Sequence, residues 1–295
     1  MGAAAALASS AMWALTSVML TSQTARLRPL VMSGVRSFTA SLMLVAMLVA
    51  TGGLGQFNEM TALTGVSMVG SGILGQALGD TLYINALGFL GVTRTFPITN
   101  SVYPFLTFLL AVLLLGESMT WAVPVGGLLI VAGITWIVLE QRRADALDVT
   151  SRVELVRGLT FALGAAAAWS CATVLLRGQQ GNLDAVGAAC LRIPAASLAV
   201  IVTVAMTSNG APPLRAVTGR SVAIVALAGV LGTGLGSVLF IYAVEHTGAA
   251  RTAFVTTSAP VFALPMGMLF LSERLTPRVL LGTLVTVLGI WMVLA

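Results

Sequence analysis

Apolar runs of about 20 residues, separated by short segments that carry most of the charges, fill this chain from end to end. An α-helix rises 1.5 Å per residue, so a run of about 20 residues spans the roughly 30 Å hydrocarbon core of a bilayer. Of the 295 residues, 58% are hydrophobic and 8% are charged, whereas roughly 25% are charged in a typical soluble domain. The pattern predicts an all-α protein embedded in a lipid bilayer.

Ten transmembrane helices are predicted from these runs. They cover residues 2–20, 30–51, 61–87, 92–115, 121–139, 158–177, 185–207, 220–244, 249–271 and 276–295. The longest polar interval, EQRRADALDVTSRVELVR, separates the fifth helix from the sixth. We therefore expect a first five-helix repeat at 1–139, a charged linker at 140–157 and a second five-helix repeat at 158–295.

The two halves of the chain repeat each other. Three unusual residues recur at an offset of 156 (169 − 13): Trp13 and Trp169, Arg36 and Arg192, and Glu117 and Glu273. In the third segment the offset is 157, where the glycines at 72, 75 and 79 meet those at 229, 232 and 236. A repeat with five helices re-enters the membrane from the opposite side, so we expect inverted repeats with a cavity between them near the midplane. Because Trp13 has a mate in the second half, residues 1–20 are expected to form a structural helix and not a removable leader.

One acidic residue, Asp80, lies within an apolar run. Gln76, Asp80 and Tyr83 are spaced i, i+4 and i+7, so they share one face of a helix and are predicted to line the cavity. A carboxylate that faces lipid costs about 2.5–3.5 kcal/mol on insertion scales, and intramembrane acids often mark substrate or coupling sites. Asp80 is thus a candidate for binding substrate and for carrying a coupling proton. The alternative is that Asp80 pairs with Arg36 or Arg94 and only holds helices together.

Further substrate-binding candidates are Asn100 and Tyr103 on the fourth helix, Thr256 on the matching ninth helix, and Trp13 on the first. Hydroxyls and an amide can orient a small polar ligand in an otherwise apolar pocket. The alternative for the polar side chains is a bond to the backbone one turn earlier or to a neighbouring helix. For Trp13 the alternative is ordinary aromatic packing.

Tyr242 and His246, spaced i, i+4 on the eighth helix, are a candidate substrate contact and a candidate proton-coupling group. A histidine that merely lies at the membrane interface is the alternative for His246. Pro104 and Pro260 lie within helices, where a missing N–H and a ring clash bend the backbone. They are predicted hinges, with static bends as the alternative.

Three pairs of motifs carry a resemblance to a known family: MWALTSV and AWSCATV, GVRSFTASL and CLRIPAASL, and YPFLTFLLAVLLLGESMT and APVFALPMGMLFLSERLT. They resemble the paired EamA domains of the drug/metabolite transporter superfamily over nearly the whole chain. The resemblance implies ten helices and the export of small metabolites such as amino acids or nucleobases. There are two departures from the pattern: Ser272 replaces the usual glycine before Glu273, and no basic residue follows Glu117.

Four residues that recur in both halves are expected to be structural: Arg36, Arg192, Glu117 and Glu273. Each arginine lies about two turns into its helix, where it can reach the headgroups or a carboxylate. As parts of the family-like motifs, the two glutamates are expected to accept N–H groups at the start of the following helix. On orientation, the positive-inside rule makes the arginine-rich connections cytoplasmic and leaves both termini outside, while the resemblance implies termini inside.

The function predicted from these patterns is secondary active export of a small organic metabolite by alternating access. An exchanger or facilitated carrier without proton coupling remains open as an alternative. A membrane enzyme acting on a lipid-linked substrate is a further alternative, but a lone histidine and no metal-ligand spacing give it little chemistry. A channel or a non-transporting scaffold is the last alternative, for which the sequence shows no ring of charge and no oligomeric motif beyond the glycine faces.

The expected partners are a small-molecule substrate, the lipid bilayer and protons, in a monomer or homodimer of the inner (plasma) membrane. No cofactor and no metal are expected, because Cys171 and Cys190 lie in apolar runs without a paired motif. The net charge of +5 reflects arginines between the helices, so nucleic acid is not an expected partner.

Overall fold

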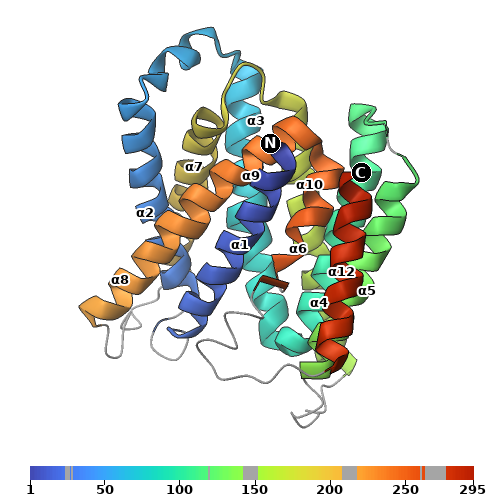
Figure 1. Ribbon diagram of the computed structural model, residues 1–295. Coiled ribbons are helices and arrows are strands. Elements are labelled where there is room, and N and C mark those ends of the chain that lie inside the picture. Colours follow the sequence, from blue (N-terminus) through green and yellow to red (C-terminus); the bar gives the residue numbers. More distant parts are fainter. Residues whose placement is uncertain are drawn as a thin grey trace.

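The computed structural model describes residues 1–295 except 24–26, 28, 119, 142–151, 208–217, 260 and 263–276. Every regular element in the described part of the chain is a helix (Figure 1). The first half contains α1 (Gly2–Thr21), α2 (Pro29–Ala50), the 3₁₀ helix η1 (Gly53–Glu59), α3 (Ala62–Gly72), the π-helix η2 (Ile73–Gly79), α4 (Asp80–Leu115) and α5 (Ala122–Gln141). The second half contains α6 (Arg152–Gln179), α7 (Ala185–Thr207), α8 (Gly219–Ala228), the π-helix η3 (Gly229–Gly236), α9 (Ser237–Thr247), α10 (Ala249–Thr256) and α12 (Pro277–Leu294).

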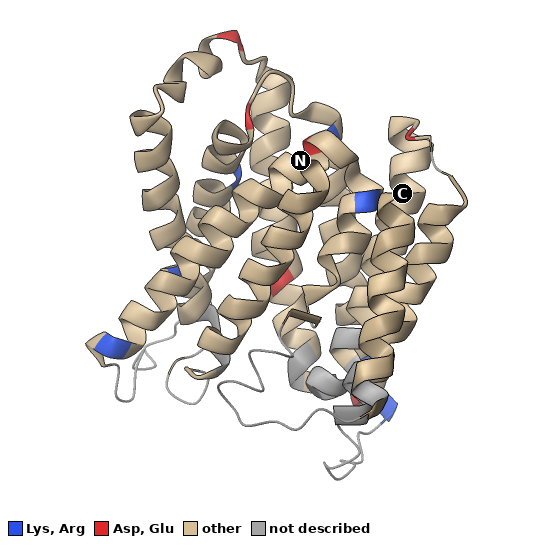
Figure 2. Cartoon of the chain, viewed as in Figure 1, with Lys and Arg blue, Asp and Glu red and all other residues tan. Residues whose placement is uncertain are grey.

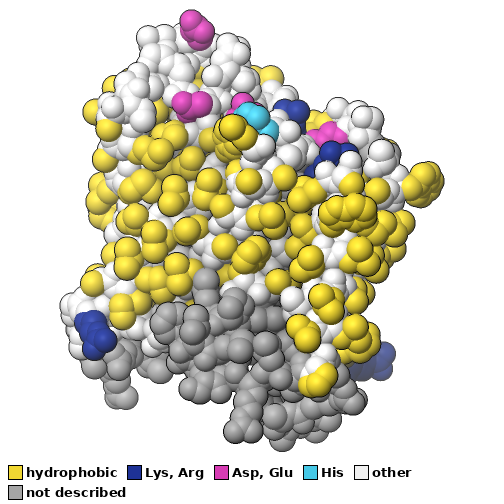
Figure 3. Space-filling view, viewed as in Figure 1, with side chains coloured by type: hydrophobic (Ala, Val, Ile, Leu, Met, Phe, Trp, Pro, Cys, Tyr) yellow, Lys and Arg dark blue, Asp and Glu magenta, His cyan; other side chains and the backbone are white. Residues whose placement is uncertain are grey.

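The outer surface is that of a membrane protein. Within the described residues, seven helical stretches are long and apolar enough to cross a bilayer, and two shorter apolar helices accompany them. Large apolar side chains point outward, among them Val66, Leu113 and Trp291, which are 68–72% exposed. Figure 3 shows hydrophobic side chains over the height of the visible face, with charged ones near its ends. The all-α membrane fold is confirmed, whereas ten helices stay a prediction because residues 263–276 lie outside the described part.

The third and fourth predicted helices are joined without a break, since α4 continues through the expected connection at residues 88–91. The direction of the chain nevertheless reverses within α4. Asp80 and Tyr103 both contact Trp169 of α6, while Leu90 between them packs on Gly158. Eleven residues of helix α6 (169 − 158) correspond to about 16 Å. The chain therefore moves away from Trp169 and returns to it, as two successive membrane crossings require.

The start of the sixth helix differs from the prediction. Helix α6 begins at Arg152, inside the segment expected as a linker. Its first turns carry the charged residues Arg152, Glu154 and Arg157. Because the prediction relied on apolar runs, it did not detect these charged turns as part of the helix. Residues 142–151 of the expected linker lie outside the described residues. The division into two repeats and a linker stays a prediction.

The first helix of each half packs on the third crossing of the other half. Helix α1 lies along η3 and α9, and helix α6 lies along η2 and α4. The indole Nε1 of Trp13 donates to the Gly232 carbonyl at 3.1 Å. A Cβ at Gly236 would come within 3.0 Å of Trp13, and one at Gly79 within 2.6 Å of Trp169. The glycines of the two π-helices thus let a tryptophan from the opposite half approach the backbone.

The third crossings of the two halves begin with the same cap. The Thr61 hydroxyl accepts from the Thr64 N–H at 3.1 Å, and the Thr218 hydroxyl accepts from the Ser221 N–H at 3.2 Å. Such threonine caps satisfy backbone donors that a helix start leaves free. In Figure 1, α3 begins at the upper end of the molecule and α8 at the lower end, while both chain ends lie at the upper end.

Candidate functional site

Asp80 joins helices from both halves of the chain. Its Oδ2 accepts from Nη2 of Arg36 on α2 at 3.1 Å, and its Oδ1 accepts from Nε1 of Trp169 on α6 at 3.1 Å. The pairing that sequence reasoning left open is therefore formed with Arg36. The Arg94 side chain lies outside the described residues. An ion pair and an indole N–H together hold a carboxylate inside a membrane-spanning segment.

The Arg36–Asp80 pair is not sealed from solvent. The side chains of Arg36 and Asp80 keep 25% and 29% of their surface accessible. Figure 2 shows that most charged residues of the described chain lie toward the two ends of the molecule, with few at mid-height. Intramembrane charges usually face protein partners or a water-filled space. About a quarter of the surface of this pair is therefore not covered by protein atoms.

Two polar atoms near the start of α4 have no hydrogen-bond partner among the described residues. One is the donor Nε of Arg36, and the other is the acceptor Oε1 of Gln76, one turn before Asp80. Buried polar atoms are paired in most proteins, and an unpaired one often faces unseen water or a ligand. One donor and one acceptor therefore keep hydrogen-bonding capacity that the described residues do not use.

Aromatic rings form a wall beside Asp80. The Trp169 ring lies 5.3 Å from that of Tyr83 and 6.2 Å from that of Tyr103, the latter edge to face. The Tyr103 hydroxyl lies 3.3 Å from the Thr173 hydroxyl. Asp80, Arg36, Trp169, Tyr83 and Tyr103 are called the Asp80 cluster below. It combines an apolar aromatic surface with a few polar groups, which is the usual composition of a small-molecule site.

Three predicted site residues lie elsewhere. Trp13 packs on Phe240 with ring centroids 5.4 Å apart. Its position against η3 corresponds to that of Trp169 against η2. The exposed His246 stacks on Tyr242 at 3.9 Å, and its Nδ1 lies 2.9 Å from the Tyr242 carbonyl. Gly2 packs against His246, so the Tyr242–His246 pair lies beside the N-terminus, at one end of the molecule. The described contacts do not connect Trp13, Tyr242 or His246 with Asp80.

The remaining candidates are partly engaged with the backbone. The Thr256 hydroxyl donates to the Thr252 carbonyl at 2.8 Å, which is the local bond that sequence reasoning kept as an alternative. Asn100 is half-buried on α4, one turn before the buried Pro104. Pro104 lies inside the unbroken α4, and Pro260 lies outside the described residues. Their role as hinges stays a prediction.

Glu117 accepts N–H groups at a helix start, but not at the following helix. Its carboxylate accepts from Ala249 N–H at 2.9 Å and from Ala250 N–H at 3.4 Å, at the beginning of α10. Gly248, with φ of 86°, turns the chain so that α10 starts against this carboxylate. Arg177 lies 3.8 Å from Glu117. Sequence reasoning placed the N–H donors at the next helix because it considered neighbours along the chain and not across the halves. Glu273 lies outside the described residues.

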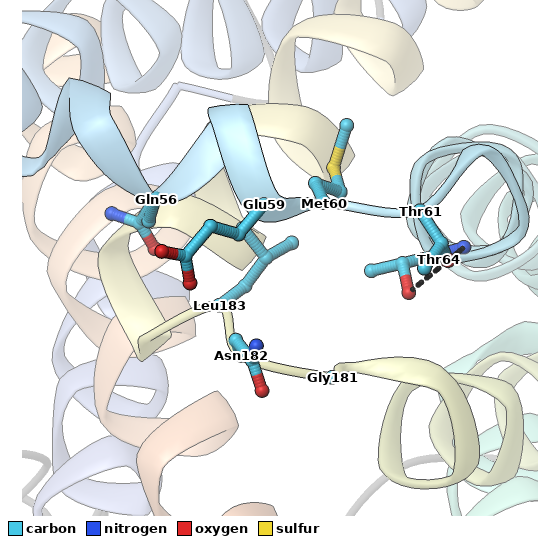
Figure 4. Close-up of a pocket in the computed structure, with 8 residues that line it drawn as sticks. All are labelled: Gln56, Glu59, Met60, Thr61, Thr64, Gly181, Asn182 and Leu183. Carbon is cyan, nitrogen blue, oxygen red and sulfur yellow. Dashed lines mark hydrogen bonds between the residues drawn. The ribbon is translucent and has the colours of Figure 1, made fainter.

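A separate small cavity of about 110 Å³ opens between η1, the start of α3 and the turn before α7 (Figure 4). It is lined by Gln56, Glu59, Met60, Thr61, Thr64, Gly181, Asn182 and Leu183. None of the predicted site residues lines it. Within the described residues, no three His, Cys, Asp or Glu side chains gather in a way that could hold a metal ion.

The residues that sequence reasoning missed belong to the second half and to the π-helices. Trp169 entered the sequence analysis only as the repeat counterpart of Trp13 and was not among the candidates, yet it contacts Asp80 directly. The π-helical turns at 73–79 and 229–236 were not foreseen. The glycines shared by the two segments marked them as equivalent but did not indicate a π-helical conformation, which is frequent at functional sites.

Comparison with known proteins supports the arrangement of two similar halves. The model of the EamA-like transporter family matches residues 1–139 and again residues 156–295. The chain belongs to the EamA-like transporter family. This EamA-like protein is accordingly a multi-pass membrane protein of a transporter family.

Two individual proteins are similar to this chain. A Pseudomonas aeruginosa protein named "Uncharacterized protein PA1977" is 32% identical over 189 residues, which are 64% of this chain and 60% of that protein's length. A solved crystal structure superposes with a TM-score of 0.80 at 18% identity, covering 99% of this chain and 95% of the other. At that identity the likeness of the EamA-like chain to the crystal structure establishes the fold alone.

Proposed function

We propose that this EamA-like protein is a secondary active transporter that exports a small organic metabolite across the inner membrane. Ten helices in two inverted five-helix repeats would expose a central site alternately to each side. The observation that carries the proposal is the accessible Asp80 carboxylate, held inside a membrane span by Arg36 of its own half and Trp169 of the other.

The contacts of Asp80 supply a link between proton binding and movement. Asp80 and Arg36 lie on helices of the first half, and Trp169 lies on a helix of the second. A movement of one half against the other would change the Asp80–Trp169 contact. Protonation of Asp80 would remove the negative charge that attracts both Arg36 and the indole N–H. Proton binding and the relative position of the halves would therefore influence each other, as proton-coupled transport requires.

A carrier without proton coupling is the second candidate. The observation in its favour is that both carboxylate oxygens of Asp80 already accept hydrogen bonds. In this alternative the carboxylate keeps the helices together and exchanges no proton. This alternative keeps the alternating-access path and differs only in the role of Asp80.

Flux through reconstituted protein tests the proposed function. Purified protein in proteoliposomes is offered a panel of labelled amino acids, nucleobases and organic acids, with a proton gradient of either direction or none. We expect at least one solute to cross faster than in protein-free liposomes, and its flux to depend on the gradient. Absence of flux across the whole panel, or an ion conductance without solute specificity, would contradict the proposal.

The indole N–H of Trp169 is expected to matter for transport. Trp169→Phe keeps an aromatic ring and removes the donor to Asp80, and a hydrogen bond to a charged group contributes about 1.5–3 kcal/mol. We expect gradient-driven flux to fall about tenfold or more, since 1.36 kcal/mol corresponds to a factor of ten. The matched control is Trp136→Phe, because Trp136 is 45% exposed on the outer surface. Equal flux in the two variants would show that the Asp80–Trp169 bond has no part in transport.

A further inference from the structure

Arg192 is a buried cation in a membrane-spanning helix. It lies on α7 and is 6% exposed. Its Nη1 donates to the Ser71 hydroxyl of α3 at 2.9 Å. A Cβ at Gly72 would lie 2.7 Å from the Arg192 Cα, so α3 and α7 are in backbone contact here. The guanidinium is thus enclosed between helices of the two halves.

The positive charge of Arg192 has no carboxylate beside it in the described structure. The ion pairs formed by described residues are Arg36 with Asp80 and Arg177 with Glu117. The counterpart of Asp80 in the second half is Ser237, at the offset of 157 (237 − 80). The repeat therefore supplies a counter-ion to Arg36 and none to its mate. Charges buried in a membrane are normally paired or face a polar space, because an uncompensated one is costly.

One hydroxyl group binds this guanidinium, and others gather around the Tyr103 hydroxyl, which lies within electrostatic range of it. Ser71 of α3 accepts its hydrogen bond, and the Tyr103 hydroxyl of α4 is a polar neighbour. Thr173 of α6 lies 3.3 Å from that tyrosine hydroxyl, and Thr256 of α10 is another of its neighbours. These residues, with Arg192, form what is called the Arg192 cluster. Hydroxyl donors around one guanidinium are the groups that bind a small anion.

Tyr103 connects the Arg192 cluster with the Asp80 cluster. Its hydroxyl lies within electrostatic range of Arg192, and its ring lies edge to face with that of Trp169, whose N–H binds Asp80. A molecule that rests against the aromatic wall of Trp169 and Tyr103 would therefore have a cation within reach of one end. The half-buried state of Tyr103 leaves part of this wall accessible.

We propose that Arg192 binds the anionic group of the transported solute, and that this group is a carboxylate. The proposal rests on the proposed transport function and narrows its substrates to small monocarboxylates. One guanidinium balances one negative charge, whereas a phosphate ester carries about −1.5 to −2 at pH 7 and would exceed it. The solute would complete the ion pair that Ser237 does not provide. Arg192, expected from the repeat to be structural, thereby has a binding role.

Matched probes test this assignment on the detergent-purified full chain. Benzoate and alanine are compared with benzamide and alaninamide, which keep the shape and lack the negative carboxylate, and with phenyl phosphate. Kd is obtained from ligand-induced shifts of Tm. We expect at least one carboxylate to bind about tenfold or more tightly than its amide, as expected for one charge-assisted hydrogen bond.

Variants then locate the preference. Arg192→Gln is expected to abolish the difference between carboxylate and amide, Arg192→Lys to keep part of it, and the control Arg177→Gln to keep it fully. Equal binding of acid and amide by the wild-type protein would overturn the proposal, whatever the variants do. Tighter binding of phenyl phosphate, or an unchanged preference in Arg192→Gln, would overturn it as well. If Arg192→Gln does not fold, the proposal is tested by the binding of each acid and its amide to the wild-type protein and to Arg192→Lys.

The failure of this proposal differs from the failure of the proposed function. Solute flux without preference for a carboxylate leaves the transporter in place and removes the role of Arg192. Carboxylate binding that depends on Arg192, with no flux of any probe in proteoliposomes, supports the binding site and contradicts transport.

Discussion

Asp80→Asn is expected to reduce gradient-driven flux about a hundredfold and to lower thermal stability. The change removes the charge that pairs with Arg36 and leaves a guanidinium in a membrane span without a counter-ion. Removing one partner of a fully buried pair costs about 3–5 kcal/mol. Because both side chains keep about a quarter of their surface accessible, we expect a loss of stability of only about 2 kcal/mol, below that range. Flux in proteoliposomes and Tm in detergent measure the two effects.

The double variant Arg36→Gln with Asp80→Asn separates structure from transport. It removes both charges, so no ion is left unpaired, and stability is expected to recover to near the wild-type value. Gradient-driven flux is expected to stay low, because the group that exchanges a proton is still missing. Recovery of gradient-driven flux together with stability would mean that the Arg36–Asp80 pair only holds helices together.

Gly72→Ala is expected to have the largest effect on the fold. A Cβ at Gly72 would lie 2.7 Å from the Cα of Arg192, and a backbone atom cannot rotate away as a side chain does. Overpacking of this kind typically costs about 1–3 kcal/mol, and here it would separate α3 from α7. We expect a lower Tm and a smaller monodisperse peak in size-exclusion chromatography. The equivalent Gly229→Ala, whose Cβ would lie 2.9 Å from the Arg36 Cα, should behave alike.

Gly34→Ala is the matched control for this substitution. Apart from its chain neighbours and the adjacent backbone of its own helix α2, no atom lies within 4 Å of a Cβ at Gly34. Alanine is favoured over glycine in a helix by up to about 1 kcal/mol, so Tm should stay the same or rise. A Gly72→Ala variant as stable as Gly34→Ala would contradict the close backbone contact between α3 and α7.

The sequence predicted the membrane fold because lipid imposes a simple rule on helix composition. Apolar runs of sufficient length must be helical and must be buried in the bilayer, so each can be read along the chain. The presence of Asp80 in such a run marked it as a candidate for the same reason. Its partnership with Arg36 was one of two stated possibilities and not a derived result.

Contacts between the two halves could not be read from the sequence. Trp169 reaches Asp80, and Glu117 reaches the start of α10, across separations of 89 and 132 residues. Such contacts depend on how helices pack, which periodicity along one helix does not encode. The π-helices were missed because glycine permits several backbone conformations and specifies none of them.

The candidate site was also obscured by the symmetry of the repeat. Identical residues at equivalent positions suggested equal roles for Arg36 and Arg192. The structure places them in different surroundings, since Arg36 pairs with a carboxylate and Arg192 donates to the hydroxyl of Ser71. The difference follows from positions where the halves diverge, Asp80 against Ser237 and Ser71 against Ala228. Divergent positions within a repeat are therefore informative about function.

The most direct test of proton-coupled transport is to record solute and proton movement together. Proteoliposomes are loaded with a transported solute and a pH-sensitive dye, at equal pH on both sides, and solute efflux is started by dilution. The account predicts that the internal pH changes as the solute leaves, and that Asp80→Asn abolishes the pH change. Solute efflux without any change of internal pH in the wild-type protein would contradict it.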